Sequence, residues 1–243
     1  MGFFRTIGSI KSIRSYHKAE ENLILMEQIT TKDGSVTYHS EEYGEAYHSL
    51  TGAKEEAIKK YAEPCRIAEL AKDQGDITLL DVCFGLGYNS AAAIDAALDI
   101  NPACRIVIIA LENDQKILDE TGNVKPDFRS YGIIKEAAQK HEAKKGNVEV
   151  NILFGDARKK IKDINEKRSF DAVFLDPFSP KRCPELWTER FLSDIHCRMK
   201  KGAILATYSC AKLVRENMKK AGFEVKDGPV VGRRAPATLA IRR

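Results

Sequence analysis

A glycine turn between an apolar run and a helix-like segment constrains the fold of this chain more than any other feature. The apolar run at 77–82 is typical of a parallel strand that is covered on both faces. Gly85 and Gly87 follow it, and because they lack a Cβ, their backbone amides can approach a bound ligand closely. Asn89 or Ser90 can then cap the next helix. The pattern predicts a strand, a turn and a helix around a nucleotide-like ligand.

Two acidic side chains near this turn help to distinguish classes of nucleotide-binding protein. Asp81 lies near the end of the first apolar run, and Glu112 follows a second run at 106–111. An acid in the position of Glu112 accepts hydrogen bonds from ribose hydroxyls, which suits both dehydrogenases and S-adenosylmethionine methyltransferases. Asp81 can pair with the ammonium group of a donor that carries an amino acid. Asp81 therefore favours a methyltransferase that uses S-adenosylmethionine.

Further apolar runs predict a Rossmann-like α/β fold. Strands are expected at 77–82, 106–111, 148–154, 170–175, 203–208, 223–226 and 238–241. They should form a mostly parallel seven-stranded sheet, in which the last two strands make an antiparallel hairpin at one edge. The charged stretch 113–147 is too long for an ordinary connection, so we expect a helix at 133–141 and an insertion that is mobile or faces the substrate.

The N-terminal part is expected to form a small extension. With 243 residues, of which 43% are hydrophobic, the chain can bury one large core. This predicts an extension at 1–52 and a methyltransferase domain at 53–243. An Asp-Gly pair between two strand-like runs of the extension predicts a β-hairpin. The stretch 41–49 should either wall the ligand site, with Tyr47 contacting the cofactor, or only join the hairpin to a helix at 53–70.

Several kinds of site and location are not expected from the composition. The N-terminus has no apolar run long enough for a signal peptide, and no later run approaches the ~20 residues of a membrane span. We therefore expect a cytoplasmic protein with no membrane partner. The six cysteines are never closer than 13 positions and so predict reduced thiols rather than a Cys-x-x-Cys pair. The histidines match no metal spacing, and no metal is expected.

The net charge of +4 is distributed unevenly. Residues 198–243 carry 12 Lys or Arg against 3 Asp or Glu, a charge of +9, whereas the preceding residues sum to −5. Basic ends are typical of a protein with a polyanionic partner, although a solvated lysine-rich surface explains the charge equally well. The candidate substrate-binding bases lie on a helix at 211–221 and in a later turn. They are Lys212, Arg215, Lys219, Arg233 and Arg234.

Four acids are expected to meet at one rim of the sheet. Asp156 and Asp176 follow two more apolar runs, as Asp81 and Glu112 do. In an open parallel sheet, ligands bind beyond the carboxyl ends of the strands. Asp156 or its neighbouring amides can read an adenine edge there, and capping of the next helix is an equally good explanation for this residue.

Four motifs together resemble one family of tRNA-modifying methyltransferases. They are Tyr-Gly-Glu-Ala-Tyr-His-Ser at 43–49, Phe-Gly-Leu-Gly-Tyr-Asn at 84–89, Phe-Asp-Ala-Val-Phe-Leu-Asp-Pro-Phe-Ser-Pro at 170–180, and Leu-Ala-Thr-Tyr at 205–208. In this combination the chain is similar to the methyltransferase domain of the bacterial bifunctional MnmC-type enzyme. That enzyme completes 5-methylaminomethyl-2-thiouridine in the tRNA anticodon.

The resemblance implies an S-adenosylmethionine-dependent N-methyltransferase. The acceptor would be the aminomethyl group of 5-aminomethyl-(2-thio)uridine at the tRNA wobble position. Asp176 matches the family's catalytic position, and Pro177 and Phe178 lie beside the substrate. The flavin-dependent oxidase half of the bifunctional form has no counterpart in these 243 residues, so we expect a separate enzyme to supply the aminomethyl-uridine.

Amine methylation makes a specific demand on Asp176. The amine must present a free lone pair, and its ordinary pKa is about 10.4, against about 3.9 for an aspartate. An aspartate with its ordinary pKa is a poor base for such an amine. We therefore expect Asp176 to accept hydrogen bonds from the amine and to stabilise the charge that forms on nitrogen, while the proton leaves through water.

Three other functions each fit part of the pattern. A nicotinamide dehydrogenase explains the glycine turn and Glu112 but not Asp81. A small-molecule amine methyltransferase or aminopropyltransferase uses the same acids but has no need of a basic C-terminal region. A non-catalytic RNA-binding relative explains the basic residues but not the intact carboxylates.

Overall fold

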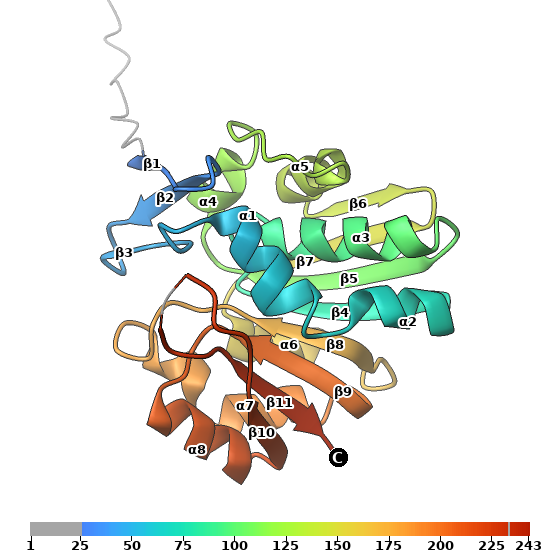
Figure 1. The fold of residues 1–243 in the computed structure, drawn as a ribbon, viewed down its shortest axis with the longest axis vertical. Helices are drawn as coiled ribbons and strands as arrows, with labels where there is room; N and C mark the ends of the chain where they lie inside the picture. Colours follow the sequence, from blue (N-terminus) through green and yellow to red (C-terminus); the bar gives the residue numbers. More distant parts are fainter. Residues whose placement is uncertain (1–25, 233) are drawn as a thin grey trace, which may run out of the picture.

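An eight-stranded sheet runs through the molecule, and a three-stranded sheet lies beside it (Figure 1). This computed structural model describes residues 26–232 and 234–243. The order of the large sheet is β10-β11-β9-β8-β4-β5-β7-β6. Its strands are β4 (Asp76–Val82), β5 (Arg105–Glu112), β6 (Glu142–Lys145), β7 (Val148–Phe154), β8 (Phe170–Leu175), β9 (Met199–Thr207), β10 (Phe223–Asp227) and β11 (Thr238–Arg242).

Strands β9, β8, β4, β5 and β7 are parallel, whereas β10, β11 and β6 pair with their neighbours in the antiparallel sense. The prediction of a mostly parallel sheet with an antiparallel edge hairpin is confirmed. The eighth strand, β6, was not predicted and occupies the opposite edge. The chain builds outward from β4 through β5 to β7 and then returns to place β8 on the other side of β4. The strand order therefore reverses between β4 and β8, which is where such sheets bind ligands.

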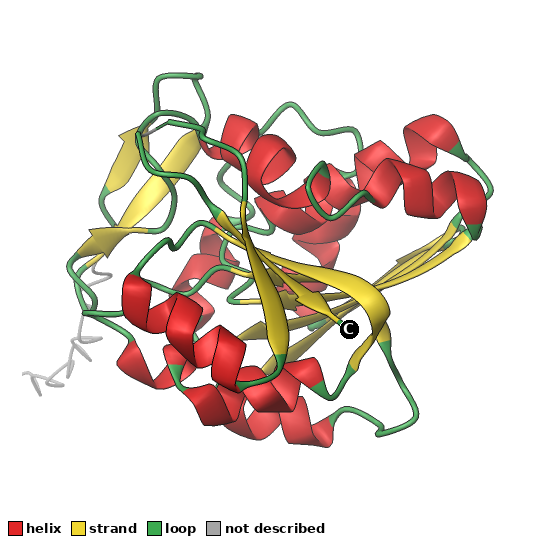
Figure 2. Cartoon of the chain, turned by 60° about the horizontal axis from the view of Figure 1, so that its bottom comes forward, coloured by secondary structure: helices red, strands yellow, loops and turns green. Residues whose placement is uncertain are grey.

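Helices cover both faces of the large sheet (Figure 2). One face packs against α2 (Ile67–Asp73), α3 (Tyr88–Ile100) and α5 (Tyr131–Lys140), and the other against α6 (Ala157–Asp163), α7 (Glu189–His196) and α8 (Lys212–Lys220). Every residue of β8 is buried. This burial on both faces is why the central strands are continuous apolar runs rather than alternating ones.

The first helical segment is broken, although a single helix was predicted at 53–70. It consists of α1 (Ala53–Glu56), a π-helical turn η1 (Ala57–Ala62) and α2. Arg66 has a left-handed backbone with φ of 58° and separates η1 from α2. The stretch 113–147 also contains more structure than predicted, because α4 (Gln115–Glu120) and β6 accompany the expected helix α5.

The small sheet confirms the predicted hairpin. Strands β1 (Gln28–Thr30) and β2 (Val36–Ser40) are antiparallel, and β3 (Glu45–Ala46) pairs with β2. The 3₁₀ turn η2 (Pro184–Trp187) precedes α7. The Asp33 side chain accepts hydrogen bonds from the Ser35 amide at 3.0 Å and from the Glu55 amide at 3.1 Å, and so links the hairpin turn to α1.

Gly87 is required by packing within the core, and its predicted contact with the cofactor stays a prediction. It precedes α3 with φ of 72°, a left-handed conformation that favours glycine. A Cβ added there would lie 2.5 Å from both Ile134 Cγ2 and Phe84 Cζ, which are core atoms. The predicted caps are wrong, since neither Asn89 nor Ser90 caps α3 through its side chain.

We predict that Gly87→Ala destabilises the fold by about 2–4 kcal/mol, because it adds backbone strain to overpacking. Urea unfolding measures this change in the free energy of unfolding. The control is Gly132→Ala in α5, where an added Cβ has no neighbour within 4 Å, so stability should stay equal or rise by up to about 1 kcal/mol. Equal stability of the two variants would contradict this explanation.

Candidate active site

A cavity of about 370 Å³ lies beyond the carboxyl ends of β4, β5, β7 and β8. Residues 43 and 45–49 line it from the N-terminal side, and Glu56 and Lys60 line it from the first helical segment. The remaining walls are the turn after β4 and the residues that follow β5, β7 and β8. The cavity therefore occupies the reversal point of the strand order, where a ligand site was expected.

Glu112 organises the wall formed by the turns after β4 and β5. One carboxylate oxygen accepts a hydrogen bond from the Gly85 amide at 2.8 Å. The other accepts from the amides of Asn113 and Asp114 at 2.8 and 2.9 Å. Burial raises the pKa of Glu112 above its ordinary value. Because each carboxylate oxygen offers two lone pairs, the oxygen bound to Gly85 can still accept from a ribose hydroxyl.

Tyr47 lies in the cavity wall, as predicted, and is held in place by two contacts. Its hydroxyl donates a hydrogen bond to Asp114. Its ring meets the Phe178 ring edge-on, with 4.9 Å between the centroids. A Cβ on Gly85 would be 3.7 Å from this tyrosine ring, so Gly85 lies directly beside the space that a cofactor would enter.

Asp81 does not line the cavity, because the sheet register places it one row inside the strand end. Asp81 is opposite Ala110 and Phe174, whereas Glu112 and Asp176 come after Leu111 and Leu175, the residues paired with the last residue of β4, Val82. Its carboxylate is fully buried and accepts a hydrogen bond from Ser90 Oγ at 2.6 Å. Burial raises the pKa of Asp81 well above its ordinary value. In this structure Asp81 binds Ser90 of α3 through Oδ2, while its Oδ1 has no hydrogen-bond partner among the described residues, and its predicted contact with a cofactor ammonium stays a prediction.

Asp156 caps a helix and lines the cavity at the same time. Its Oδ1 accepts from the Arg158 amide at 2.9 Å at the start of α6, and its Oδ2 lies 2.7 Å from the Arg158 guanidinium. The hydrogen bond from Arg158 lowers the pKa of Asp156. The helix-capping interpretation of this residue is therefore correct, and contact with an adenine remains a prediction.

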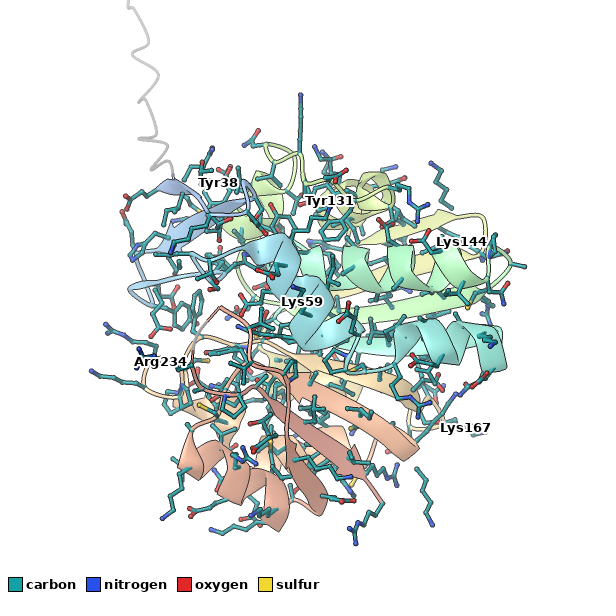
Figure 3. The ribbon with its side chains drawn as sticks, in the orientation of Figure 1. Tyr38, Lys59, Tyr131, Lys144, Lys167 and Arg234 are labelled. Carbon is teal, nitrogen blue, oxygen red and sulfur yellow. The ribbon has the colours of Figure 1, made fainter. Side chains whose placement is uncertain are left out.

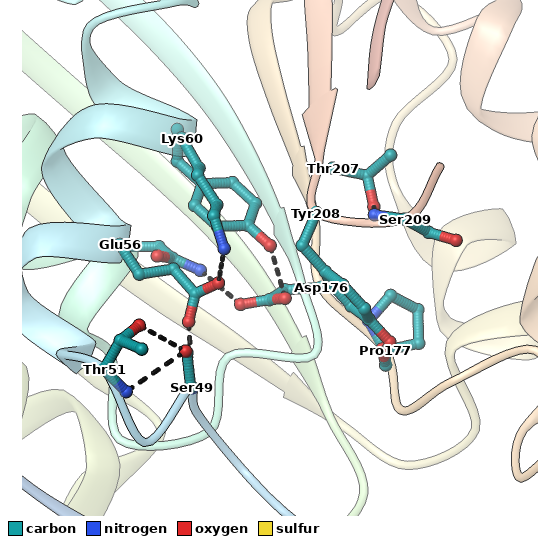
Figure 4. A network of polar contacts seen from close by, with 11 residues as sticks. Ser49, Thr51, Glu56, Lys60, Asp176, Pro177, Thr207, Tyr208 and Ser209 are labelled. Atoms are coloured by element: carbon teal, nitrogen blue, oxygen red, sulfur yellow. Dashed lines mark hydrogen bonds and ion pairs between the residues drawn. The ribbon is translucent and has the colours of Figure 1, made fainter. Parts of the chain in front are cut away.

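Asp176 also lines the cavity, and its carboxylate has hydrogen-bond partners from two other elements, η1 and α3 (Figure 4). Its carboxylate accepts a hydrogen bond from the Tyr61 hydroxyl and another from Asn89 Nδ2 at 2.8 Å. Burial, reinforced by the nearby Glu56 carboxylate, raises the pKa of Asp176 to about 7. The hydrogen bonds from Tyr61 and Asn89 and the positive charge of Lys60 limit this rise. Asn89 does not line the cavity, and its contact with the site is the hydrogen bond that it donates to Asp176.

The loop after Asp176 is fastened to the N-terminal sheet. Pro177 and Phe178 line the cavity, as predicted, and the Phe178 ring stacks on Tyr43 with 4.4 Å between the centroids. The Glu45 carboxylate accepts from the Ser179 amide at 3.0 Å and from the Ser179 hydroxyl at 2.5 Å. The sequence did not predict this stacking or these hydrogen bonds, because they join residues more than 130 positions apart.

The four predicted substrate-binding bases that the structure describes lie outside the cavity. Lys212, Arg215 and Lys219 are on α8, where Arg215 forms an ion pair with Asp227 at 2.5 Å. Arg234 lies in the loop between β10 and β11 (Figure 3). This loop approaches the site, since a Cβ on Gly232 would be 3.6 Å from the hydroxyl of Ser49, which lines the cavity. Arg233 lies outside the described residues.

Within 26–232 and 234–243, no group of three or more His, Cys, Asp or Glu side chains is arranged to hold a metal ion. In the same two ranges, no helix combines the length and apolar character needed to span a bilayer.

This fold and this cavity are those of a methyltransferase, and comparison with known proteins agrees. A family model described as S-adenosyl-L-methionine-dependent methyltransferase matches residues 119–243. The chain belongs to this family, and its cofactor is S-adenosylmethionine. The predicted cofactor is thus confirmed, and the dehydrogenase alternative is wrong.

Among individual proteins, this chain is similar to ones named MNMC2 and MnmC. A crystal structure of MNMC2 from Aquifex aeolicus is 37% identical, with a TM-score of 0.78, and the match covers 90% of this chain and 70% of that one. An uncharacterized protein of Methanocaldococcus jannaschii is 32% identical over 94% of this chain and 62% of its own length. The tRNA 5-methylaminomethyl-2-thiouridine biosynthesis bifunctional protein MnmC of Pseudomonas entomophila is 24% identical over 81% of this chain. This chain spans 32% of that bifunctional relative and is related to its methyltransferase domain.

We predict that calorimetry detects binding of S-adenosylhomocysteine, the demethylated cofactor, and detects no binding of NAD. Glu112→Ala should weaken this binding more than 10-fold, because it releases the three amides that shape the wall and removes a ribose acceptor. The control is Glu149→Ala on β7, which removes an acid that pairs with exposed Lys144. Tight NAD binding, or unchanged affinity in Glu112→Ala, would refute this assignment.

Proposed function

We propose that the chain methylates the aminomethyl group of 5-aminomethyl-(2-thio)uridine at the wobble position of tRNA. The observation that carries this proposal is the Asp176 carboxylate, which faces the cavity with a pKa raised to about 7. The relationship to the methyltransferase part of the MnmC proteins supports the choice of acceptor.

The raised pKa changes the role that the sequence suggested for Asp176. A primary amine is mostly protonated at neutral pH and has no lone pair to donate. Raising the pKa of the carboxyl from 3.8 to about 7 reduces the free-energy cost of taking the amine proton by roughly 4 kcal/mol. Asp176 then acts as the general base itself, so a route through water is not needed.

The other residues of the site hold this acid and the base of the acceptor. Tyr61 and Asn89 fix the two oxygens of Asp176 and so orient its lone pairs. The stacked rings of Tyr43 and Phe178 offer an aromatic surface beside it, which suits a flipped-out pyrimidine. S-adenosylmethionine supplies the electrophilic methyl group when it is bound.

We predict that Asp176→Ala lowers the rate of methyl transfer about 100-fold to 1,000-fold, and that Asp176→Asn lowers it similarly because an amide cannot take the proton. Labelled S-adenosylmethionine with RNA carrying 5-aminomethyl-uridine measures this rate, and free polyamines in parallel test the small-amine alternative. Affinity for S-adenosylhomocysteine should stay near that of the wild type. The control is Asp163→Asn, an exposed acid of α6. Full activity of Asp176→Asn would remove the carboxylate from the mechanism.

We also predict that basic residues near β10, β11 and α8 bind the tRNA backbone. Each neutralised phosphate releases counterions, so affinity should fall as salt rises. Replacing Lys212, Lys219 and Arg234 with Ala should make the slope of log affinity against log salt concentration less steep. The expected change in this slope is about 0.7–0.9 for each phosphate contact that is lost. Arg215 is kept, because it is bound closely to Asp227 at 2.5 Å, whereas Lys212 is exposed and its ion pair with Glu216 is looser, at 3.8 Å.

The control for this experiment removes three positive charges at the opposite edge of the sheet, by replacing Lys140, Lys144 and Lys145 with Ala. This control should keep the wild-type salt slope. If the two triple variants bind tRNA alike, the RNA site lies elsewhere on the molecule.

A further inference from the structure

A buried ion pair beside Asp176 has so far been described only by its effect on the pKa of Asp176. Lys60 and Glu56 are only 3% and 8% exposed, and both line the cavity. Lys60 Nζ donates a hydrogen bond to Glu56 Oε1. Removing two charges from water costs more than a simple attraction usually returns. A pair of this kind at the wall of a cavity therefore calls for a functional explanation.

The geometry of the pair leaves hydrogen-bond donors available toward the cavity. An ammonium group has three hydrogens, and Glu56 is the one hydrogen-bond partner of Lys60 within the described residues. Glu56 is itself fixed, because its Oε2 accepts from the Ser49 amide at 2.9 Å. The ammonium is thus held in one place with donors to spare (Figure 4).

The π-helical turn explains how Lys60 comes to lie beside Asp176. Turns of this kind are rare and occur mostly at functional sites. In this turn, the consecutive residues Lys60 and Tyr61 both lie near Asp176. Tyr61 donates to Asp176, and Lys60 acts on the same carboxylate through its charge. The cavity therefore presents a hydrogen-bond acceptor, Asp176, next to a fixed donor, Lys60.

We propose that Lys60 is a substrate-binding residue, which donates a hydrogen bond to a carbonyl oxygen adjacent to the amine that is methylated. This inference rests on the proposed function. In 5-aminomethyl-uracil the O4 oxygen is attached to the ring carbon next to the one that carries the aminomethyl group. The amine would bind Asp176 while O4 binds Lys60. This pairing selects an aminomethyl pyrimidine that has O4 over an amine that lacks a neighbouring acceptor, such as a polyamine.

The test compares two RNA hairpins that differ by one heavy atom of the target base, the O4 oxygen, whose removal leaves a hydrogen on C4 and takes the hydrogen from N3. One carries 5-aminomethyl-uridine, and the other carries the same nucleotide without O4. The wild-type protein should lose about 10-fold to 100-fold in kcat/KM without O4, the effect of one hydrogen bond to a charged group. The variant is Lys60→Met combined with Glu56→Gln, so that no unpaired charge stays buried. It should be slower on the first hairpin and should show no difference between the two.

The control is Lys59→Met combined with Glu55→Gln, the neighbouring pair at the same spacing on the exposed surface. It should discriminate between the hairpins as the wild type does. If the wild type methylates both hairpins equally, or the Lys60 variant still discriminates, the inference is overturned while the proposed function stands. A Lys60 variant that loses only affinity for S-adenosylhomocysteine would show that Lys60 binds the cofactor carboxylate, and would also overturn it. If the wild type methylates neither hairpin, the proposed function itself fails.

Discussion

The Asp176 carboxylate accepts hydrogen bonds from Tyr61 and Asn89 at a place where burial and the Glu56 charge oppose its ionisation. The rest of the site depends on this balance. An aspartate that was freely solvated would ionise near pH 4 and would be a weak base for an amine. One that was buried without donors would stay protonated and could not accept a proton. Three elements that are distant in the sequence meet to hold the acid between these limits.

Much of the architecture was predictable because it depends on local sequence. The central strands are buried on both faces, and their apolar runs mark them clearly. Glu112, Asp156 and Asp176 follow such runs. Because neighbouring parallel strands end at the same edge of a sheet, the sequence predicted that these acids lie close together, and all three line the cavity. The Asp-Gly turn specified the hairpin of the N-terminal sheet equally well. In each case a few neighbouring residues determine the outcome.

The remaining features depend on contacts that no local pattern records. The register of the sheet places Asp81 opposite Ala110 and Phe174, two positions before Glu112 and Asp176, and so buries it inside the sheet. Packing against Ile134 and Phe84 explains why a side chain cannot be added at Gly87. The segment that carries Lys60 and Tyr61 has the composition of an ordinary helix, so nothing in it signalled a π-helical turn. An acid and a base four positions apart are usually an exposed pair, and only the tertiary structure shows that Glu56 and Lys60 are buried.

The central claim is that Asp176 loses its proton near neutral pH, and it can be measured directly by infrared spectroscopy. A protonated carboxyl group has a carbonyl stretch that disappears on ionisation. Subtracting the spectrum of Asp176→Asn from that of the wild type isolates this residue from Asp81 and Glu112, which are also buried. The account predicts that the signal is present at pH 5 and is lost with a midpoint near pH 7. A midpoint near pH 4, the ordinary value for an aspartate, would contradict it.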